Sequence, residues 1–199
     1  QMLAKLQQGN PSAIKLHDIA TSPGGEPVQV LEIGTNIEDV PAIFVGANFE
    51  GDVPLSTEGA LYLAKMLLDS ADYTKNMKWY IMPLPNPDAA AGFFATVKSG
   101  LTVNKFKVNN DTDEAINEDD FDDLNGDGLI TQIRVKDLEG NYVISKNDAR
   151  ILERASSQKG QRGEYKIYTE GIDNDNDGEY NEDGEGGINV GISFPHLFP

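Results

Sequence analysis

Two short acidic segments carry residues whose types and spacing indicate metal chemistry. Residues 123–128 (DLNGDG) and 173–178 (DNDNDG) share the pattern D-x-[DN]-x-D-G. Oxygen atoms at positions 1, 3 and 5 of such a loop can surround one hard cation, and the glycine at position 6 permits the sharp turn that brings a later carbonyl inward. The candidate calcium ligands are Asp123, Asn125, Asp127, Asp173, Asp175, Asp177, Glu182 and Asp183.

The two segments differ from an EF-hand in their closing residue. Position 12, which holds a bidentate glutamate in an EF-hand, is Arg134 in the first segment and Gly184 in the second. Strands rather than helices are expected on either side. We therefore predict calcium held in a different loop setting, with magnesium less suited because it demands tighter octahedral geometry. The open alternative is an acidic loop that is solvated and binds nothing specific.

The acidic residues of the chain are concentrated in two ranges that contain these two segments. The chain has 199 residues, with 33 Asp+Glu, 16 Lys+Arg and a formal charge of −17. Residues 109–128 hold nine acids and residues 173–185 hold seven, without a single base in either range. This balance excludes nucleic acid and anionic lipid as partners, because both need clustered Lys and Arg. Calcium-dependent loops would fit an extracytoplasmic protein, whether periplasmic, surface-bound or secreted.

The residue inventory narrows the possible chemistry further. The chain has no cysteine, so disulfides, thiol catalysis and cysteine-ligated zinc are excluded. Imidazole could come only from His17, which we expect on the solvated face of a strand, or from His196, for which we expect a packing or surface role. No apolar run approaches the length needed for membrane insertion.

The elements that must position these residues follow from periodicity. Ranges 13–20, 28–33, 41–48 and 78–86 read as strands, and 41–48 is a continuous apolar run typical of burial on both faces. Apolar residues at helical spacing predict a helix from Ser56, as its N-cap, to about Ala71. This order predicts an α/β fold with a mixed sheet flanked by helices. Ranges 132–136 and 164–168 read as short strands beside the acidic loops. We expect one domain over 1–199 with acidic insert loops at 109–128 and 173–185.

Four segments together resemble the zinc carboxypeptidases, or metallocarboxypeptidases. Residues 10–34 resemble the opening strand pair, 41–70 the first buried strand with the zinc-ligand loop and helix, and 79–94 a strand followed by an Asn-Pro-Asp-Gly turn. Residues 170–195 resemble the stretch leading into an Asp-Leu-Asn-Arg-Asn-Phe-Pro motif. The Asp-rich stretch DLNGDGLITQIRVKD resembles a bacterial branch of the family. The resemblance implies the carboxypeptidase-like fold, or the N-terminal part of it.

The resemblance also implies a mechanism of zinc-assisted peptide hydrolysis. The family supplies His-x-x-Glu and a later His to zinc, a further Glu as general base, and an Asn-Arg pair that grips the C-terminal carboxylate of the peptide. In this chain the zinc-ligand positions are Glu50 and Val53, and the carboxylate-binding positions are Gly191 and Ile192. Asn189 stands where the family has Asp. The later His and the Glu base would lie after Pro199.

Two other features of the family have partial counterparts in this sequence, namely its Asn-Pro-Asp-Gly turn and an arginine that follows it. Asn86-Pro87-Asp88 matches the turn, although Ala89 replaces its glycine, and Lys98 stands near the position of a family Arg. Asp52 could join Glu50 in a weak hard-metal site, or both could be solvated loop acids. We expect Trp79, Tyr80, Phe93 and Phe94 to pack in the interior rather than to bind substrate.

Three hypotheses remain open on these residues. The favoured one is a carboxypeptidase-like domain that has lost zinc-dependent hydrolysis and acts in binding, with a peptide or cell-surface ligand, or as a structural module. The second is an active zinc carboxypeptidase that cleaves C-terminal residues, with further site residues after Pro199. The third is a calcium-stiffened extracellular module. Valine offers no donor atom to zinc and isoleucine cannot pair with a carboxylate, so no catalytic residue and no zinc are expected in this chain.

Overall fold

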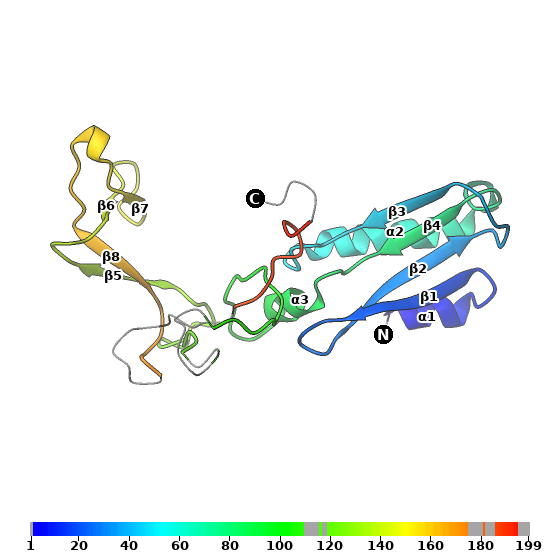
Figure 1. Cartoon of the computed structure of the whole chain (residues 1–199), viewed down its shortest axis with the longest axis horizontal. Coiled ribbons are helices and arrows are strands. Elements are labelled where there is room, and N and C mark those ends of the chain that lie inside the picture. Colours follow the sequence, from blue (N-terminus) through cyan, green and yellow to red (C-terminus); the bar gives the residue numbers. More distant parts are fainter. Residues whose placement is uncertain (1, 110–115, 117–118, 175–180, 182–185, 195–199) are drawn as a thin grey trace. The chain divides into compact units, whose positions relative to one another are not determined.

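The structure is a computed structural model that describes residues 2–109, 116, 119–174, 181 and 186–194. The backbone divides into two compact units (Figure 1). Unit 1 comprises residues 1–108 and 186–199, and unit 2 comprises residues 109–185. The expectation of one domain over 1–199 with acidic insert loops at 109–128 and 173–185 stays a prediction. In sequence, these two ranges fall at the beginning and at the end of unit 2.

Unit 1 is a mixed sheet with helices. Its elements are α1 (Met2–Gly9), β1 (Ile14–Thr21), β2 (Pro27–Gly34), β3 (Ala42–Gly46), α2 (Pro54–Asp69), a 3-10 turn (Ala71–Tyr73), β4 (Lys78–Met82) and α3 (Pro87–Phe93). The strand order is β1-β2-β4-β3. β2 pairs antiparallel with both β1 and β4, whereas β3 pairs parallel with β4, with Val45 opposite Ile81. The predicted mixed sheet flanked by helices is confirmed.

The core of unit 1 lies between the sheet and α2 (Figure 1). Alternate residues of the strands point to this side because side chains in a strand alternate between the two faces of the sheet. Positions three and four apart on α2 supply the opposing surface. The cluster consists of Ile14, Leu31, Ile33, Ala60, Ala64, Leu67 and Ile81. Leu3 and Leu6 of α1 pack against it, so both helices cover the same face. No described helix is long and apolar enough to cross a bilayer.

Two local expectations are wrong. Strand β3 was expected to be buried on both faces, but Ala42 to Phe44 are exposed because β3 is an edge strand of the described sheet. Ser56 was expected to cap α2, but the helix begins two residues earlier with Pro54, whose fixed φ suits the first turn. The Ser56 hydroxyl donates to the Val53 carbonyl at 2.7 Å instead.

Unit 2 contains an antiparallel sheet. Its strands are β5 (Gln132–Lys136), β6 (Tyr142–Ile144), β7 (Leu152–Arg154) and β8 (Tyr165–Thr169), in the order β5-β8-β6-β7, with a 3-10 turn at Ser157–Lys159. The described part of this unit has no buried hydrophobic side chain. Its buried side chains are polar, namely Asp119, Ser145 and Glu170. Hydrogen bonds to these groups therefore carry much of its internal order.

Candidate functional site

The loop after β3 carries Glu50 and Val53, the two residues predicted from the sequence to stand at zinc-ligand positions. Asn48 shapes this loop from a buried position with a left-handed backbone (φ 54°). Its Oδ1 accepts the Val53 N–H at 2.9 Å, and its Nδ2 donates to the Gly51 carbonyl at 3.3 Å and to Thr57 Oγ1 at 3.1 Å. The Asn48 amide therefore fixes both the loop and the start of α2.

Gly51 packs this loop closely against α3. Its φ of +81° lies in the left-handed region, and a Cβ there would be 2.5 Å from the Ala89 Cβ and 2.7 Å from the Ala90 nitrogen. Only glycine both adopts this φ readily and leaves room for the close approach to α3. The loop that bears Glu50 and Val53 is thus seated on the first turn of α3.

The Asn-Pro-Asp turn forms the start of α3. The Asn86 side chain caps the helix by accepting the Ala89 N–H at 3.2 Å, and its Nδ2 donates to the Thr102 carbonyl at 3.0 Å. Pro87 occupies the first turn, where a missing N–H costs nothing. Asn86 is fully buried, so this cap ties α3 to the segment around Thr102.

Asp88 joins three separate segments of unit 1. Its carboxylate accepts the Ser22 hydroxyl at 2.6 Å, the Gly24 N–H at 3.1 Å and the Lys105 N–H at 3.0 Å. Burial of Asp88 raises its pKa, but these hydrogen bonds outweigh that effect and hold the pKa below its ordinary value. Asp88 is therefore a structural anion that connects the start of α3 to the segments around Ser22 and Lys105.

The structure brings the zinc-loop residue and the carboxylate-loop residues together. Glu50 Oε2 accepts a hydrogen bond from Asn189 Nδ2 at 2.9 Å, and the same nitrogen donates to Thr102 Oγ1 at 3.0 Å. Asn189 Oδ1 accepts the Gly191 N–H at 2.8 Å. A Cβ at Gly191 would run into the Glu50 carboxylate. One residue of the predicted zinc loop and two of the predicted carboxylate-binding segment thus form a polar cluster with Thr102. The cluster consists of Glu50, Thr102, Asn189 and Gly191.

The two hydrocarbon replacements lie outside this cluster of hydrogen bonds. The Val53 side chain is 47% exposed and Ile192 is 62% exposed. Phe194 packs edge-to-face on Phe49 with ring centroids 5.8 Å apart, which holds the end of the described C-terminal segment beside the loop. Asp52 is exposed. No carboxylate or imidazole that could complete a metal site with Glu50 is grouped with it in the described residues.

The sequence profile of zinc carboxypeptidases matches residues 1–131 of this chain, which is well over half of its length. The chain belongs to the zinc carboxypeptidase family.

The chain also has partial matches among solved structures, all at low identity. Bovine thrombin-activatable fibrinolysis inhibitor in complex with a tick carboxypeptidase inhibitor is 17% identical, with a TM-score of 0.44, over 58% of this chain and 37% of that chain. Carboxypeptidase A from Helicoverpa armigera is 24% identical, with a TM-score of 0.37, over 46% of this chain and 23% of that chain. A metallo-carboxypeptidase from Burkholderia cenocepacia is 16% identical, with a TM-score of 0.31, over 48% of this chain and 27% of that chain. This family member thus spans about a third or less of their lengths. A search of curated proteins gave no match.

The residues predicted to stand at the family's zinc positions, Glu50 and Val53, do not have the chemistry of zinc ligands. Zinc sites in proteins use histidine or cysteine with at most one or two carboxylates. Here one position is a carboxylate that already accepts a hydrogen bond from Asn189, and the other is a valine without a donor atom. His17, the histidine that the structure describes, lies on β1 and contacts Glu32 with its Nε2 at 2.8 Å. It is exposed, as expected for a solvated strand residue.

The first acidic loop is ordered by its own side chains. Asp123 accepts the N–H groups of Gly126, Asp127 and Gly128 at 2.8 to 3.1 Å. Asn125 Oδ1 accepts the Asp127 N–H at 2.8 Å, and Asp127 Oδ1 accepts the Leu129 N–H at 2.9 Å. Of the second loop, Asp173 is half-buried, and the other predicted ligands lie outside the described residues. These are Asp175, Asp177, Glu182 and Asp183.

Two buried acids connect the acidic segments of unit 2 and were not predicted. Glu170 accepts the Thr131 hydroxyl at 2.6 Å, the Thr131 N–H at 3.0 Å, and the N–H groups of Leu124 and Asn125. The pKa of Glu170 lies below its ordinary value, and the hydrogen bonds from Thr131 are the largest cause of this lowering. Asp119 accepts the N–H groups of Asn174 and Asn181. Nothing in the sequence distinguishes these acids from their solvated neighbours, because their partners, mostly backbone N–H groups, are distant in the chain.

The aromatic residues are less buried than predicted. Trp79 packs against the core and donates its indole N–H to the Tyr73 carbonyl at 2.9 Å. Phe93 and Phe94 form an edge-to-face pair, with centroids 5.1 Å apart, but both rings are exposed. Lys98 lies over the Phe93 ring at 6.0 Å. The expectation that both phenylalanines are interior is therefore wrong. His196 lies outside the described residues.

Proposed function

We propose that this member of the zinc carboxypeptidase family has lost zinc-dependent peptide hydrolysis and acts by binding, with a peptide or cell-surface ligand. The observation that carries the proposal is the hydrogen bond from Asn189 to Glu50. It joins the former zinc loop to the former carboxylate-binding loop at 2.9 Å through protein atoms alone. A metal at this place would have to compete with that bond and with the adjacent Gly191 backbone.

The second support is chemical. Without the histidine and with Val53 in place of the glutamate, the two family positions on this loop supply at most one ligand to zinc. Ile192 cannot form the bidentate hydrogen bonds by which an arginine holds a peptide carboxylate, bonds that are among the strongest in protein recognition. Metal binding and substrate anchoring are therefore weakened at the same time.

The test measures zinc and activity in the purified full chain. After dialysis against zinc, elemental analysis should find far less than one zinc per chain, and blocked dipeptides should not be hydrolysed. The matched variant carries Glu50→His together with Val53→Glu, which rebuilds the family's His-x-x-Glu. It should take up more zinc than the parent because two ligands then come from one loop. One zinc per parent chain, with hydrolysis that a zinc chelator stops, would establish the alternative of an active carboxypeptidase.

We also propose that the acidic segments of unit 2 bind calcium as a structural ion. The support is the absence of buried hydrophobic side chains from the described part of this unit, which leaves it without the core that normally stabilises a small unit. The loop at 123–128 carries its oxygen donors at the required spacing, with Gly126 and Gly128 at positive φ. Calcium concentrations outside the cytoplasm suit such a site, and we propose an extracytoplasmic location on this ground.

The calcium proposal is tested by melting the full chain with and without the ion. Calcium should raise the melting temperature of unit 2, a chelator should remove the gain, and magnesium should give less because of its stricter geometry. Asp123→Asn should weaken the calcium response, whereas Asp72→Asn, on an exposed turn of unit 1, should leave it unchanged. An unchanged melting curve in calcium would contradict the proposal.

A further inference from the structure

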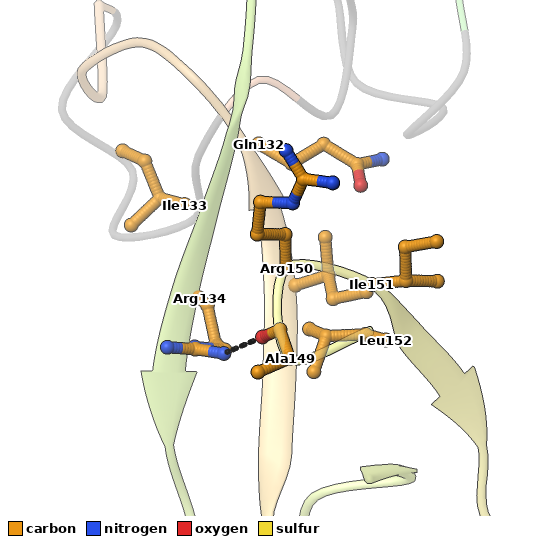
Figure 2. A pocket seen from close by; sticks show the side chains of 8 residues that line it. Gln132, Ile133, Arg134, Ala149, Arg150, Ile151 and Leu152 are labelled. Atoms are coloured by element: carbon orange, nitrogen blue, oxygen red, sulfur yellow. Dashed lines mark hydrogen bonds between the residues drawn. The ribbon is translucent and has the colours of Figure 1, made fainter. Parts of the chain in front are cut away.

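An open groove of about 570 Å³ lies on one face of the unit 2 sheet (Figure 2). This volume falls within the range of small-ligand sites in proteins. Residues from β5, β8 and the segment leading into β7 line it. The aliphatic part consists of Ile151, Leu152 and Ile167, and the charged part consists of Arg134 and Arg150. The groove belongs to unit 2 alone, and its residues lie after the stretch matched by the family profile.

Strand pairing explains why the groove exists. β5 and β8 are paired along their whole length, with Arg134 opposite Ile167. β6, in contrast, is paired with β8 at a single position, Tyr142 opposite Tyr165. The β6–β7 hairpin therefore diverges from β8, and the groove opens between them. Alternation along β5 places Gln132 and Arg134 on the same face.

Arg134 is held in place but keeps hydrogen-bonding capacity. Its guanidinium lies over the Tyr165 ring at 5.1 Å. Nη1 donates to the Ala149 carbonyl at 3.5 Å, as the dashed line in Figure 2 shows. These contacts occupy one face of the guanidinium group and one of its nitrogen atoms. Within the described residues, Arg134 forms no ion pair with a carboxylate. A guanidinium with five donors in a planar fork then has free donors for a planar anion.

Arg150 also lines the groove, and its charge is neutralised by Asp148. Asp148 binds its Nε at 3.0 Å and its Nη2 at 2.7 Å. This pair orients the Arg150 side chain and cancels its charge. The two arginines and Asp148 together therefore carry a net charge of about +1, in a chain whose total charge is −17.

We propose that this groove binds a monocarboxylate with an aliphatic body, through Arg134 and the apolar wall of Ile151, Leu152 and Ile167. One net positive charge matches a monoanion better than a phosphate dianion, and the fork geometry of guanidinium matches the two oxygens of a carboxylate. The aliphatic side chains would cover the hydrocarbon part of the ligand. Two sources carry this chemistry: a free branched-chain acid, or the C-terminal end of a peptide with an aliphatic last residue. The proposal does not depend on zinc or calcium.

The test is calorimetric titration of the full chain with three probes. These are isocaproate, acetyl-Ala-Ala-Leu with a free carboxylate, and the same peptide as its amide. Saturable binding of isocaproate or of the free-carboxylate peptide is expected, and the tighter of the two identifies the source. The amide should bind at least about tenfold more weakly, because the charge-assisted hydrogen bonds to Arg134 are lost.

Variants separate the groove from non-specific attraction. Arg134→Gln should weaken binding by about tenfold or more, and Arg134→Lys should also weaken it because the charge stays but the fork is lost. Arg162→Gln, an arginine of the same unit outside the groove, is the matched control and should bind as the parent does. Thermal melting of each variant checks that unit 2 is folded. Failure of both acids to bind, equal binding of the amide, or an unchanged affinity in Arg134→Gln would overturn the proposal.

Discussion

The anchor formed by Asp88 gives the sharpest stability prediction. The side chain is 3% exposed and accepts three hydrogen bonds from two distant segments, at 2.6, 3.0 and 3.1 Å. A hydrogen bond to a charged group contributes roughly 1.5–3 kcal/mol, and the individual values do not add fully because the donors regain water. Asp88→Ala should therefore lower the free energy of unfolding of unit 1 by about 3 kcal/mol. Asp88→Asn should cost less, because one oxygen remains as an acceptor.

The assay uses the chain's single tryptophan. Trp79 lies on β4 and packs against the core, so its fluorescence in a urea titration reports the unfolding of unit 1. The matched control is Asp72→Ala, because Asp72 is 84% exposed and pairs with Lys75 on the surface. Its effect should stay below about 1 kcal/mol.

The pH dependence adds an independent check. The folded pKa of Asp88 lies below its ordinary value of 3.8, so the unfolded state binds the proton more readily. Its stabilising contribution is therefore complete above the unfolded pKa and is lost as pH falls through the folded pKa. The difference between the parent and Asp88→Asn should be constant above about pH 5 and shrink below about pH 4. A loss smaller than about 0.5 kcal/mol in Asp88→Ala, or a difference that is unchanged at low pH, would refute the reasoning.

Three further predictions concern the loop, the cluster and unit 2. Gly51→Ala should destabilise unit 1 by about 2 kcal/mol or more in the same fluorescence assay, because the new Cβ meets α3 and the residue has a φ of +81°. Glu50→Ala, Asn189→Ala and their combination form a double-mutant cycle, in which a coupling energy of about 1 kcal/mol is expected; a value near zero would mean that the bond does not join the loops. Glu170→Gln should make unit 2 more susceptible to proteolysis while the Trp79 unfolding transition stays unchanged. Low pH should have the same effect on unit 2 of the parent chain, because the Glu170 carboxylate becomes protonated once the pH falls below its lowered pKa.

Regular elements with strong periodicity were predictable from the sequence. The ranges 28–33 and 132–136 match β2 and β5 closely, because strict alternation leaves little choice of structure. The short strands β6 and β7 were not predicted. They have only three residues each, and their pairing is settled by contacts distant in sequence. Helix α1 was also not predicted, although its Leu3 and Leu6 pack on the core.

The hydrogen bonds of the candidate site could not be predicted from the sequence. Motif spacing assigned Glu50 and Gly191 to two family motifs, an assignment that stays a prediction, and the structure places these two residues next to each other. The partner of Glu50 could not be read from the sequence, because a hydrogen bond between residues 139 positions apart depends on the fold. The exposure of β3 has a similar cause. Its apolar run indicates burial, but its place at the edge of the described sheet leaves the side chains uncovered.

The point at which the chain leaves and re-enters unit 1 has a consequence for how such proteins can vary. The Asn104 N–H donates to the Ile188 carbonyl at 3.0 Å, and the Ile188 N–H donates to Asn104 Oδ1 at 2.9 Å. These two hydrogen bonds of unit 1 therefore hold together the chain segments that precede and follow unit 2. Since the entropy of closing a loop rises only slowly with its length, unit 1 tolerates a long or a short segment between these ends almost equally well. This junction is a place where evolution or an engineer can exchange one module for another while the scaffold stays the same.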